Sequence, residues 1–237
     1  MKAIMYDKDG TLMRFDAFWI PVTKAAIRSI IKTIAPENFK FADQTANEIE
    51  KKIGITGQTA DPAGILCGGT YSQFADAANE VFAKFGINEK IDGSTIERAT
   101  ADSVDEGDVL PACDDLRAKL EKARQKARLF VVTTDNRQVT EYCLKKLGIY
   151  DLFDGVYCDD GITPHKPDPF AADEIAKKLN ADKSEIFMVG DTATDKNFAY
   201  DAGATFVFVG KDRAIAEKST YRADNAGLAT DLILNLL

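Results

Sequence analysis

The sequence has little cysteine and histidine and no long apolar run. Its four cysteines, Cys67, Cys113, Cys143 and Cys158, form no CxxC pair, and a single histidine is too few to complete a structural zinc site. Reduced thiols in a cytoplasmic protein are therefore expected. No apolar run approaches the roughly 18 residues needed to cross a bilayer. The N-terminal stretch becomes charged by residue 7, which is too early for the apolar part of a signal peptide. We therefore expect neither a signal peptide nor a membrane partner.

An excess of positive charge is also lacking. Lysine and arginine number 30 against 38 aspartate and glutamate, a net charge of −8. This balance argues against binding to nucleic acid, whose phosphate backbone requires a basic face. A small anionic substrate remains compatible, because a few local cations or a bound metal can reverse the field inside one pocket. With 237 residues, of which 45% are hydrophobic, the chain is globular and longer than one domain of about 150 residues.

Five short apolar runs predict the strands of a parallel sheet. They are continuous rather than alternating, as expected for strands buried on both faces. Helical patterns lie between them, for example Gln138–Leu147 and Phe170–Leu179. This alternation, with right-handed crossovers, predicts an α/β fold with a doubly wound parallel sheet and helices on both sides. The five runs are Ala3–Tyr6, Leu129–Val132, Gly155–Cys158, Ile186–Val189 and Thr205–Val209.

A long helical insert interrupts this alternation after the first strand. Residues 14–106 show almost no strand signal, and their apolar residues recur at three- and four-residue steps. We therefore expect a sheet domain of residues 1–13 plus 107–237 and an all-helical domain of residues 14–106. The predicted helical segments are a stripe from Phe15 to Ile30, and then Asp43–Ile53, Tyr71–Phe85 and Ser94–Val104.

Acids, a hydroxyl and a lysine follow the ends of four predicted strands. Each has an ordinary explanation: turn chemistry for Asp7 and Asp9, capping of the following helix for Thr133 and for Asp191, and a solvated loop cation for Lys166. A parallel sheet, however, brings the carboxyl ends of its strands to one edge, where open α/β sheets bind ligands. Together these groups predict a metal-assisted phosphoryl-transfer site. They are Asp7 and Asp9, Thr133, Lys166, and Asp191 and Asp195.

Four motifs in this order resemble those of the haloacid dehalogenase superfamily of phosphohydrolases. The resemblance covers the whole sheet domain, and the helical insert matches the family's cap in position and size. The motifs are Asp-x-Asp-Gly-Thr at Asp7 to Thr11, the strand-end Thr133, Lys-Pro-Asp-Pro at Lys166 to Pro169, and Gly-Asp-x-x-x-Asp at Gly190 to Asp195.

The resemblance implies a Mg²⁺-dependent phosphatase that acts on a small phosphorylated metabolite. Mg²⁺ would be held by the carboxylates of Asp7 and Asp191 and by the backbone carbonyl of Asp9. Asp7 would also attack phosphorus to form an aspartyl-phosphate. Asp9 would protonate the leaving group and then deprotonate the attacking water. An aspartate at position 9 indicates a phosphatase or phosphomutase rather than a phosphonate- or halide-cleaving branch.

The same resemblance assigns the remaining residues and shows two departures. Thr133, Thr134 and Lys166 would bind phosphate oxygens, and Asp195 would orient Lys166 or a metal-bound water. Thr134 stands where asparagine is common in the family. Lys8 stands where a hydrophobic residue is usual; it raises the local positive charge, and its position can face away from the site.

Within the superfamily the chain looks most like the phosphoglycolate phosphatase group. Its stretch from Leu147 to Phe153 and its Lys-Pro-Asp-Pro motif carry this similarity. 2-Phosphoglycolate is then one candidate substrate, and sugar phosphates and nucleotides are others. A β-phosphoglucomutase-like phosphomutase, which uses the same nucleophile and acid/base pair, is an alternative. A non-catalytic metabolite-binding or signalling protein is the alternative of another class, disfavoured because all the reacting groups are present.

Overall fold

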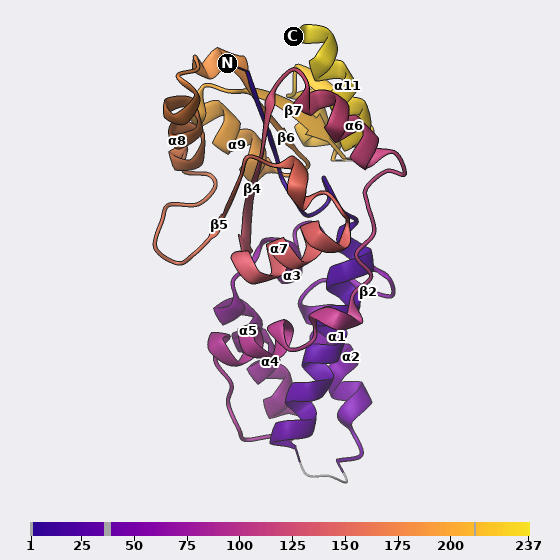
Figure 1. The fold of residues 1–237 in the computed structure, drawn as a ribbon. Coiled ribbons are helices and arrows are strands. Elements are labelled where there is room, and N and C mark those ends of the chain that lie inside the picture. The colour runs from indigo at the N-terminus through magenta and orange to yellow at the C-terminus, as the bar shows by residue number, and fades with distance from the viewer. Residues whose placement is uncertain (1, 36–38, 211) are drawn as a thin grey trace. The chain divides into compact units, whose positions relative to one another are not determined.

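The chain divides into two compact units (Figure 1). The computed structural model describes residues 2–35, 39–210 and 212–237. One unit comprises the residues up to Arg14 together with Val109–Leu237, and the other comprises Phe15–Asp108. The first unit contains the large sheet and the second is mainly helical.

A six-stranded parallel sheet forms the centre of the first unit, in the order β5-β4-β1-β6-β7-β8. The chain adds β4 and β5 on one side of β1 and then β6, β7 and β8 on the other. The expected doubly wound sheet is confirmed. Ligands of such sheets bind beyond the carboxyl ends of the strands where the order reverses, which here is the end of β1. The strands are β1 Ala3–Tyr6, β4 Arg128–Asn136, β5 Gly155–Asp159, β6 Ile186–Gly190, β7 Thr205–Val209 and β8 Tyr221–Ala223.

Helices cover both faces of this sheet. Successive side chains of a strand point to opposite faces, so each buried strand contributes residues to the apolar clusters on both sides. Ile4 and Tyr6 of β1 pack into one apolar cluster with α6, α7 and α11. Ala3 and Met5 pack into another with α8 and α9. The fully buried β1 is thus fixed from both sides, which fixes the position of the residues that follow it. The helices of this unit are α6 Leu116–Arg124, α7 Arg137–Lys146, α8 Phe170–Leu179, α9 Ala193–Ala202, α10 Arg213–Glu217 and α11 Ala226–Leu236, with 3-10 turns η2 Tyr150–Leu152 and η3 Lys183–Glu185.

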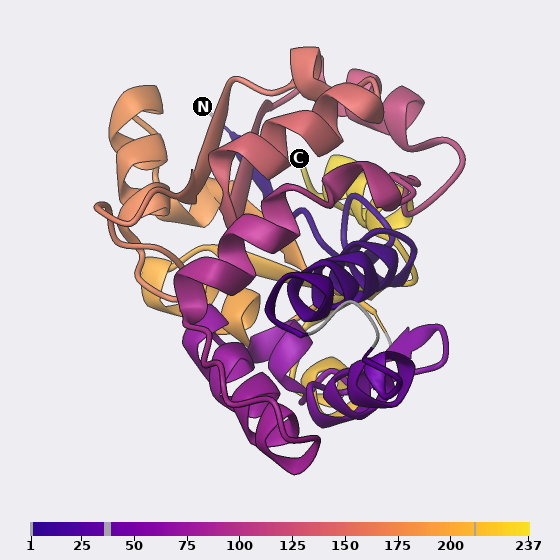
Figure 2. The same cartoon turned by 90° about the horizontal axis from the view of Figure 1, so that it is seen from below.

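The second unit has its own apolar core, built from α1, α2, α4 and α5. Figure 2 shows α1 in indigo, close to end-on. An all-helical insert was expected, and the structure corrects this, because the two short strands β2 and β3 pair as an antiparallel hairpin. Gly57 makes the hairpin turn with a φ of 64°, which a glycine adopts without strain. The elements are α1 Phe15–Ile34, α2 Ala42–Lys52, β2 Ile55–Thr56, β3 Thr59–Ala60, α3 Ile65–Gly68, α4 Tyr71–Lys84, α5 Gly93–Ala101 and η1 Val104–Glu106.

None of the helices in the described ranges combines the length and the apolarity that crossing a membrane requires.

Candidate active site

Parallel pairing of β1 with β6 brings two acids together at the edge of the sheet. Tyr6 is in register with Val189, and the backbone N–H of Asp7 donates to the carbonyl of Val189 at 2.9 Å. Asp7 directly follows β1, and Asp191 directly follows β6. The two carboxylates therefore come from adjacent strand ends, where the sequence predicted them.

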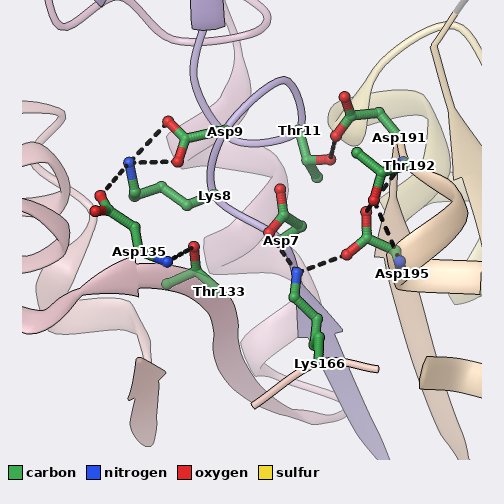
Figure 3. Close-up of polar contacts among 10 residues, drawn as sticks. All are labelled: Asp7, Lys8, Asp9, Thr11, Thr133, Asp135, Lys166, Asp191, Thr192 and Asp195. Atoms are coloured by element: carbon green, nitrogen blue, oxygen red, sulfur yellow. Dashed lines mark hydrogen bonds and ion pairs between the residues drawn. The ribbon is translucent and has the colours of Figure 1, made fainter. Parts of the chain in front are cut away.

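Lys166 joins two carboxylates in the interior of the first unit. Its Nζ lies 2.5 Å from Asp7 Oδ1 and 2.6 Å from Asp195 Oδ1 (Figure 3). All three residues are buried, with Lys166 only 5% exposed. Burial by itself would lower the pKa of Lys166, but Asp195 and Asp7 raise it above its usual value. Lys166 is thus a buried lysine held between two carboxylates and not a solvated loop residue.

The first turn of α9 fixes the orientation of Asp195. Thr192 is the N-cap of this helix, and its hydroxyl donates to Asp195 Oδ2 at 2.6 Å. The backbone N–H of Thr192 donates to the same oxygen at 3.0 Å. The other oxygen, Oδ1, is left to accept from Lys166. Gly190 permits this approach, because a Cβ there would lie 2.4 Å from the Cβ of Asp195.

Gly10 and Thr11 of the first motif place Asp191. The Thr11 hydroxyl donates to Asp191 Oδ1 at 2.9 Å. Gly10 has a φ of 78°, and a Cβ added to it would lie 2.2 Å from Asp191 Oδ2. The turn after β1 therefore both contacts Asp191 and leaves room for it. Because Thr192 caps α9, the alternative role of Asp191 as a helix cap is wrong.

The acids at this edge, once ionised, carry more negative charge than Lys166 can balance. Asp7, Asp191 and Asp195 each offer a carboxylate oxygen within 4.8 Å of the others. Burial raises the pKa of Asp7 to about 7, against the opposing effect of Lys166. Burial, and then repulsion from Asp7 and Asp195, raises the pKa of Asp191 well above its usual value. When all three are ionised, the ammonium of Lys166 leaves two negative charges uncompensated. A divalent cation fits this charge and this set of oxygen donors.

Asp9 lies in a second charged cluster with Lys8 and Asp135. The Nζ of Lys8 is 2.7 Å from each oxygen of the Asp9 carboxylate and 3.1 Å from Asp135 Oδ2 (Figure 3). Lys8 is fully buried. The Lys8 ammonium is thus paired with these two carboxylates, and its effect on the charge at the Asp7 end of the site stays a prediction.

Thr133 and Thr134 differ in where their side chains lie. Thr133 is buried, and its hydroxyl accepts a hydrogen bond from the backbone N–H of Asp135 at 3.2 Å, whereas Thr134 is exposed. A strand end was expected at Val132, but β4 continues to Asn136. Asn136 caps α7, so the alternative that Thr133 caps this helix is wrong.

Two residues of the site carry no role in the sequence analysis. Thr192 was recognisable from its spacing, since threonine followed three residues later by an acid is a capping-box pattern. Asp135 had no local signal, because its contact with Lys8 joins residues 127 positions apart.

Comparisons with known proteins bear on the family of the chain. The chain matches the family described as haloacid dehalogenase-like hydrolase over residues 1–203. A phosphoglycolate phosphatase of Neisseria gonorrhoeae is 30% identical over 100 residues, covering 40% of this chain and 42% of that protein. An N-acetylmuramic acid 6-phosphate phosphatase of Pseudomonas putida is 22% identical over 209 residues, covering 86% of this chain and 80% of that protein.

A solved structure supports the fold. The crystal structure of a HAD-superfamily hydrolase of subfamily IA from Geobacter sulfurreducens aligns with a TM-score of 0.63 at 18% identity, covering 98% of this chain and 96% of that one. The matched stretch spans about two fifths of the length of some curated relatives, 42% of the Neisseria protein and 39% of the pyrophosphatase PpaX of Halalkalibacterium halodurans. The family match itself covers most of this chain. With the four motifs meeting at one edge of a doubly wound sheet, the chain belongs to the haloacid dehalogenase-like hydrolases.

Proposed function

We propose that this hydrolase is a Mg²⁺-dependent phosphatase that acts on a small phosphorylated metabolite through an aspartyl-phosphate on Asp7. The observation that carries the proposal is the buried contact between Lys166 Nζ and Asp7 Oδ1, with the oxygens of Asp191 and Asp195 within 4.8 Å. A carboxylate that can attack phosphorus, a cation that can bind phosphate and further oxygen ligands thus lie together.

Asp7 and Asp191 are the proposed carboxylate ligands of the cation, with the backbone carbonyl of Asp9 as a third. Bound Mg²⁺ would supply the positive charge that offsets repulsion between the carboxylates and a phosphate ester. Asp195 is better suited to hold Lys166, because both of its oxygens are already engaged, one by Thr192 and one by Lys166.

The proposed reaction has two steps, the formation and the hydrolysis of the aspartyl-phosphate. In the first, an Asp7 oxygen bonds to phosphorus as the ester P–O bond breaks, and Asp9 gives its proton to the departing oxygen. In the second, Asp9 takes a proton from water, the water oxygen bonds to phosphorus, and the Asp7–phosphorus bond breaks to release inorganic phosphate. Lys166 and the hydroxyls of Thr133 and Thr134 are proposed to bind the phosphate oxygens, where charge concentrates in the transition state.

The substrate proposed is a small phosphorylated acid or sugar. The two relatives reported above are named for phosphoglycolate and for N-acetylmuramic acid 6-phosphate, and this chain is similar to both. We propose that residues 14–106 form the cap that selects between such compounds. Hydrolysis of a panel containing both compounds and several nucleotides tests this choice. A phosphatase releases inorganic phosphate, whereas a phosphomutase would return an isomerised sugar phosphate.

Hydrolysis of p-nitrophenyl phosphate tests the proposed reaction. We expect turnover with Mg²⁺ and none with a chelator. Asp7→Asn should abolish it, because an amide is a poor nucleophile, and Asp9→Asn should slow it strongly. Asp76→Asn, at an exposed position of α4, makes the same chemical change away from the site and should keep full activity. Full activity of Asp7→Asn, or activity that survives chelation, would refute the mechanism.

A further inference from the structure

Lys8 is an unusual residue to find with no exposed side-chain surface. Its ammonium lies among the Asp9 and Asp135 carboxylates, and Met13 Sδ lies 3.8 Å from it. A lysine is almost never fully buried unless its charge is paired, because desolvation of an unpaired ammonium is costly. Lys8 meets this condition through its two carboxylate partners, and it lies between Asp7 and Asp9 in the chain. We therefore ask what the pairing does for Asp9.

The contact with Asp9 constrains the orientation of that carboxylate. Both Asp9 oxygens are 2.7 Å from Lys8 Nζ, so the carboxylate plane is held and its two oxygens face one donor (Figure 3). The Asp9 side chain keeps 18% of its surface exposed, so part of it remains accessible to solvent. A carboxyl group that must exchange protons works only within hydrogen-bond reach of the reacting oxygen, so its orientation matters.

Asp135 in turn fixes Lys8. One Asp135 oxygen, Oδ1, accepts from the backbone N–H of Asn136 at 2.8 Å, and the other lies 3.1 Å from Lys8 Nζ. The backbone of β4 thus holds Asp135, Asp135 holds Lys8, and Lys8 holds Asp9. This chain of contacts joins the strand that carries Thr133 to the turn that follows β1.

We propose that Lys8, anchored by Asp135, is a positioning residue that orients the Asp9 carboxyl for its proton transfers. The inference rests on the proposed function, since it assigns a partner to the acid/base group of that reaction. The competing explanation is that Lys8 only neutralises the buried charge of Asp135. The two explanations differ in what happens when both members of the Lys8–Asp135 pair are removed together.

The test compares two aryl esters that differ in their need for an acid. The phenolate leaving group of phenyl phosphate is basic and gains from protonation by Asp9, whereas p-nitrophenolate departs readily without it. In each case the P–O bond to the aryl oxygen breaks and an Asp7 oxygen bonds to phosphorus. Release of the aryl alcohol is measured with enzyme in excess and Mg²⁺ saturating, so hydrolysis of the aspartyl-phosphate does not enter the rate.

We expect the ratio of the p-nitrophenyl rate to the phenyl rate to rise about tenfold in Lys8→Met, part of the 10²–10⁴ typical of a general acid. The double variant Lys8→Met/Asp135→Asn should recover part of the thermal midpoint lost in Lys8→Met, because the buried Asp135 carboxylate is then no longer left unpaired. Its rate ratio should nevertheless remain raised. In an Asp9→Asn background, Lys8→Met should change the ratio no further, because the group it positions is already gone.

A wild-type ratio in the folded double variant would overturn the inference and leave Lys8 as a counter-charge for Asp135. A further change of the ratio in the Asp9→Asn background would also overturn it, because Lys8 would then act through another group. These results leave the proposed function intact. Wild-type protein that releases neither alcohol with Mg²⁺ would instead overturn the proposed function itself.

Discussion

The metal-free protein is expected to lose stability as the pH rises through 7, and Asp7→Asn should remove the part of this loss that Asp7 causes. Burial raises the pKa of Asp7 from 3.8 to about 7 in the folded chain, and the unfolded chain keeps the ordinary value. Because the folded pKa is the higher one, the native state binds this proton more tightly. Its contribution to stability is therefore complete below pH 3.8 and is lost as the pH rises through about 7.

The size of the effect follows from the same shift. A rise from 3.8 to about 7 is about 3 pH units, or about 4 kcal/mol of unfolding free energy at its upper limit. When the pH falls from 8.5 to 5.5, linkage predicts that the free energy of unfolding rises by about 2 kcal/mol of this limit. For a chain of this size that amounts to roughly 4–8 °C in the thermal midpoint.

Thermal unfolding in the presence of a chelator measures this directly. The wild type should gain stability relative to Asp7→Asn on going from pH 8.5 to pH 5.5, since the asparagine carries no titrating proton. Asp76→Asn, exposed on α4, should follow the wild type. Mg²⁺ should raise the wild-type midpoint more at pH 8.5 than at pH 5.5, because the cation replaces the proton. Parallel curves for the wild type and Asp7→Asn would refute the reasoning.

The remaining predictions concern the residues that support the site. Thr11→Val removes the hydrogen bond to Asp191, and the Mg²⁺ concentration for half-maximal activity should rise about tenfold; an unchanged value would contradict the role of Thr11. Asp195→Asn leaves Lys166 with one carboxylate partner, and kcat/KM for p-nitrophenyl phosphate should fall about 100-fold. Gly10→Ala pushes a Cβ against Asp191 and should abolish activity. Gly86→Ala matches it in φ, 77° against 78°, but meets no atom within 4 Å, so only a stability loss of about 1 kcal/mol is expected, measured by denaturant unfolding.

The central strands could be predicted from the sequence because they are buried on both faces. Ala3–Tyr6 and Thr205–Val209 form strands over the predicted residues. The sixth strand, β8, was missed, because Tyr221–Ala223 is short, lies at the sheet edge and contains a charged arginine. The hairpin β2–β3 was missed for a similar reason, since two-residue strands have no periodicity to recognise.

The meeting of the site's acids and Lys166 could also be predicted, because it follows from strand topology. Asp7 and Asp191 follow adjacent parallel strands, so one rule of sheet geometry brings them together. The cluster of Lys8, Asp9 and Asp135 could not be predicted in this way. It depends on the turn at Gly10 and on β4 continuing past Val132, and neither is set by an apolar pattern.

The most direct test of the central claim is detection of the phosphoryl group on Asp7 itself. Protein mixed with substrate and Mg²⁺ is quenched in acid within milliseconds, digested and sequenced by mass spectrometry, with Asp9→Asn included because it should hydrolyse the intermediate slowly. The account predicts one phosphoryl group on Asp7, more of it in Asp9→Asn, and none in Asp7→Asn. A phosphoryl group on another residue would contradict the account. So would turnover by the wild type with no phosphorylated protein detected in the wild type or in Asp9→Asn.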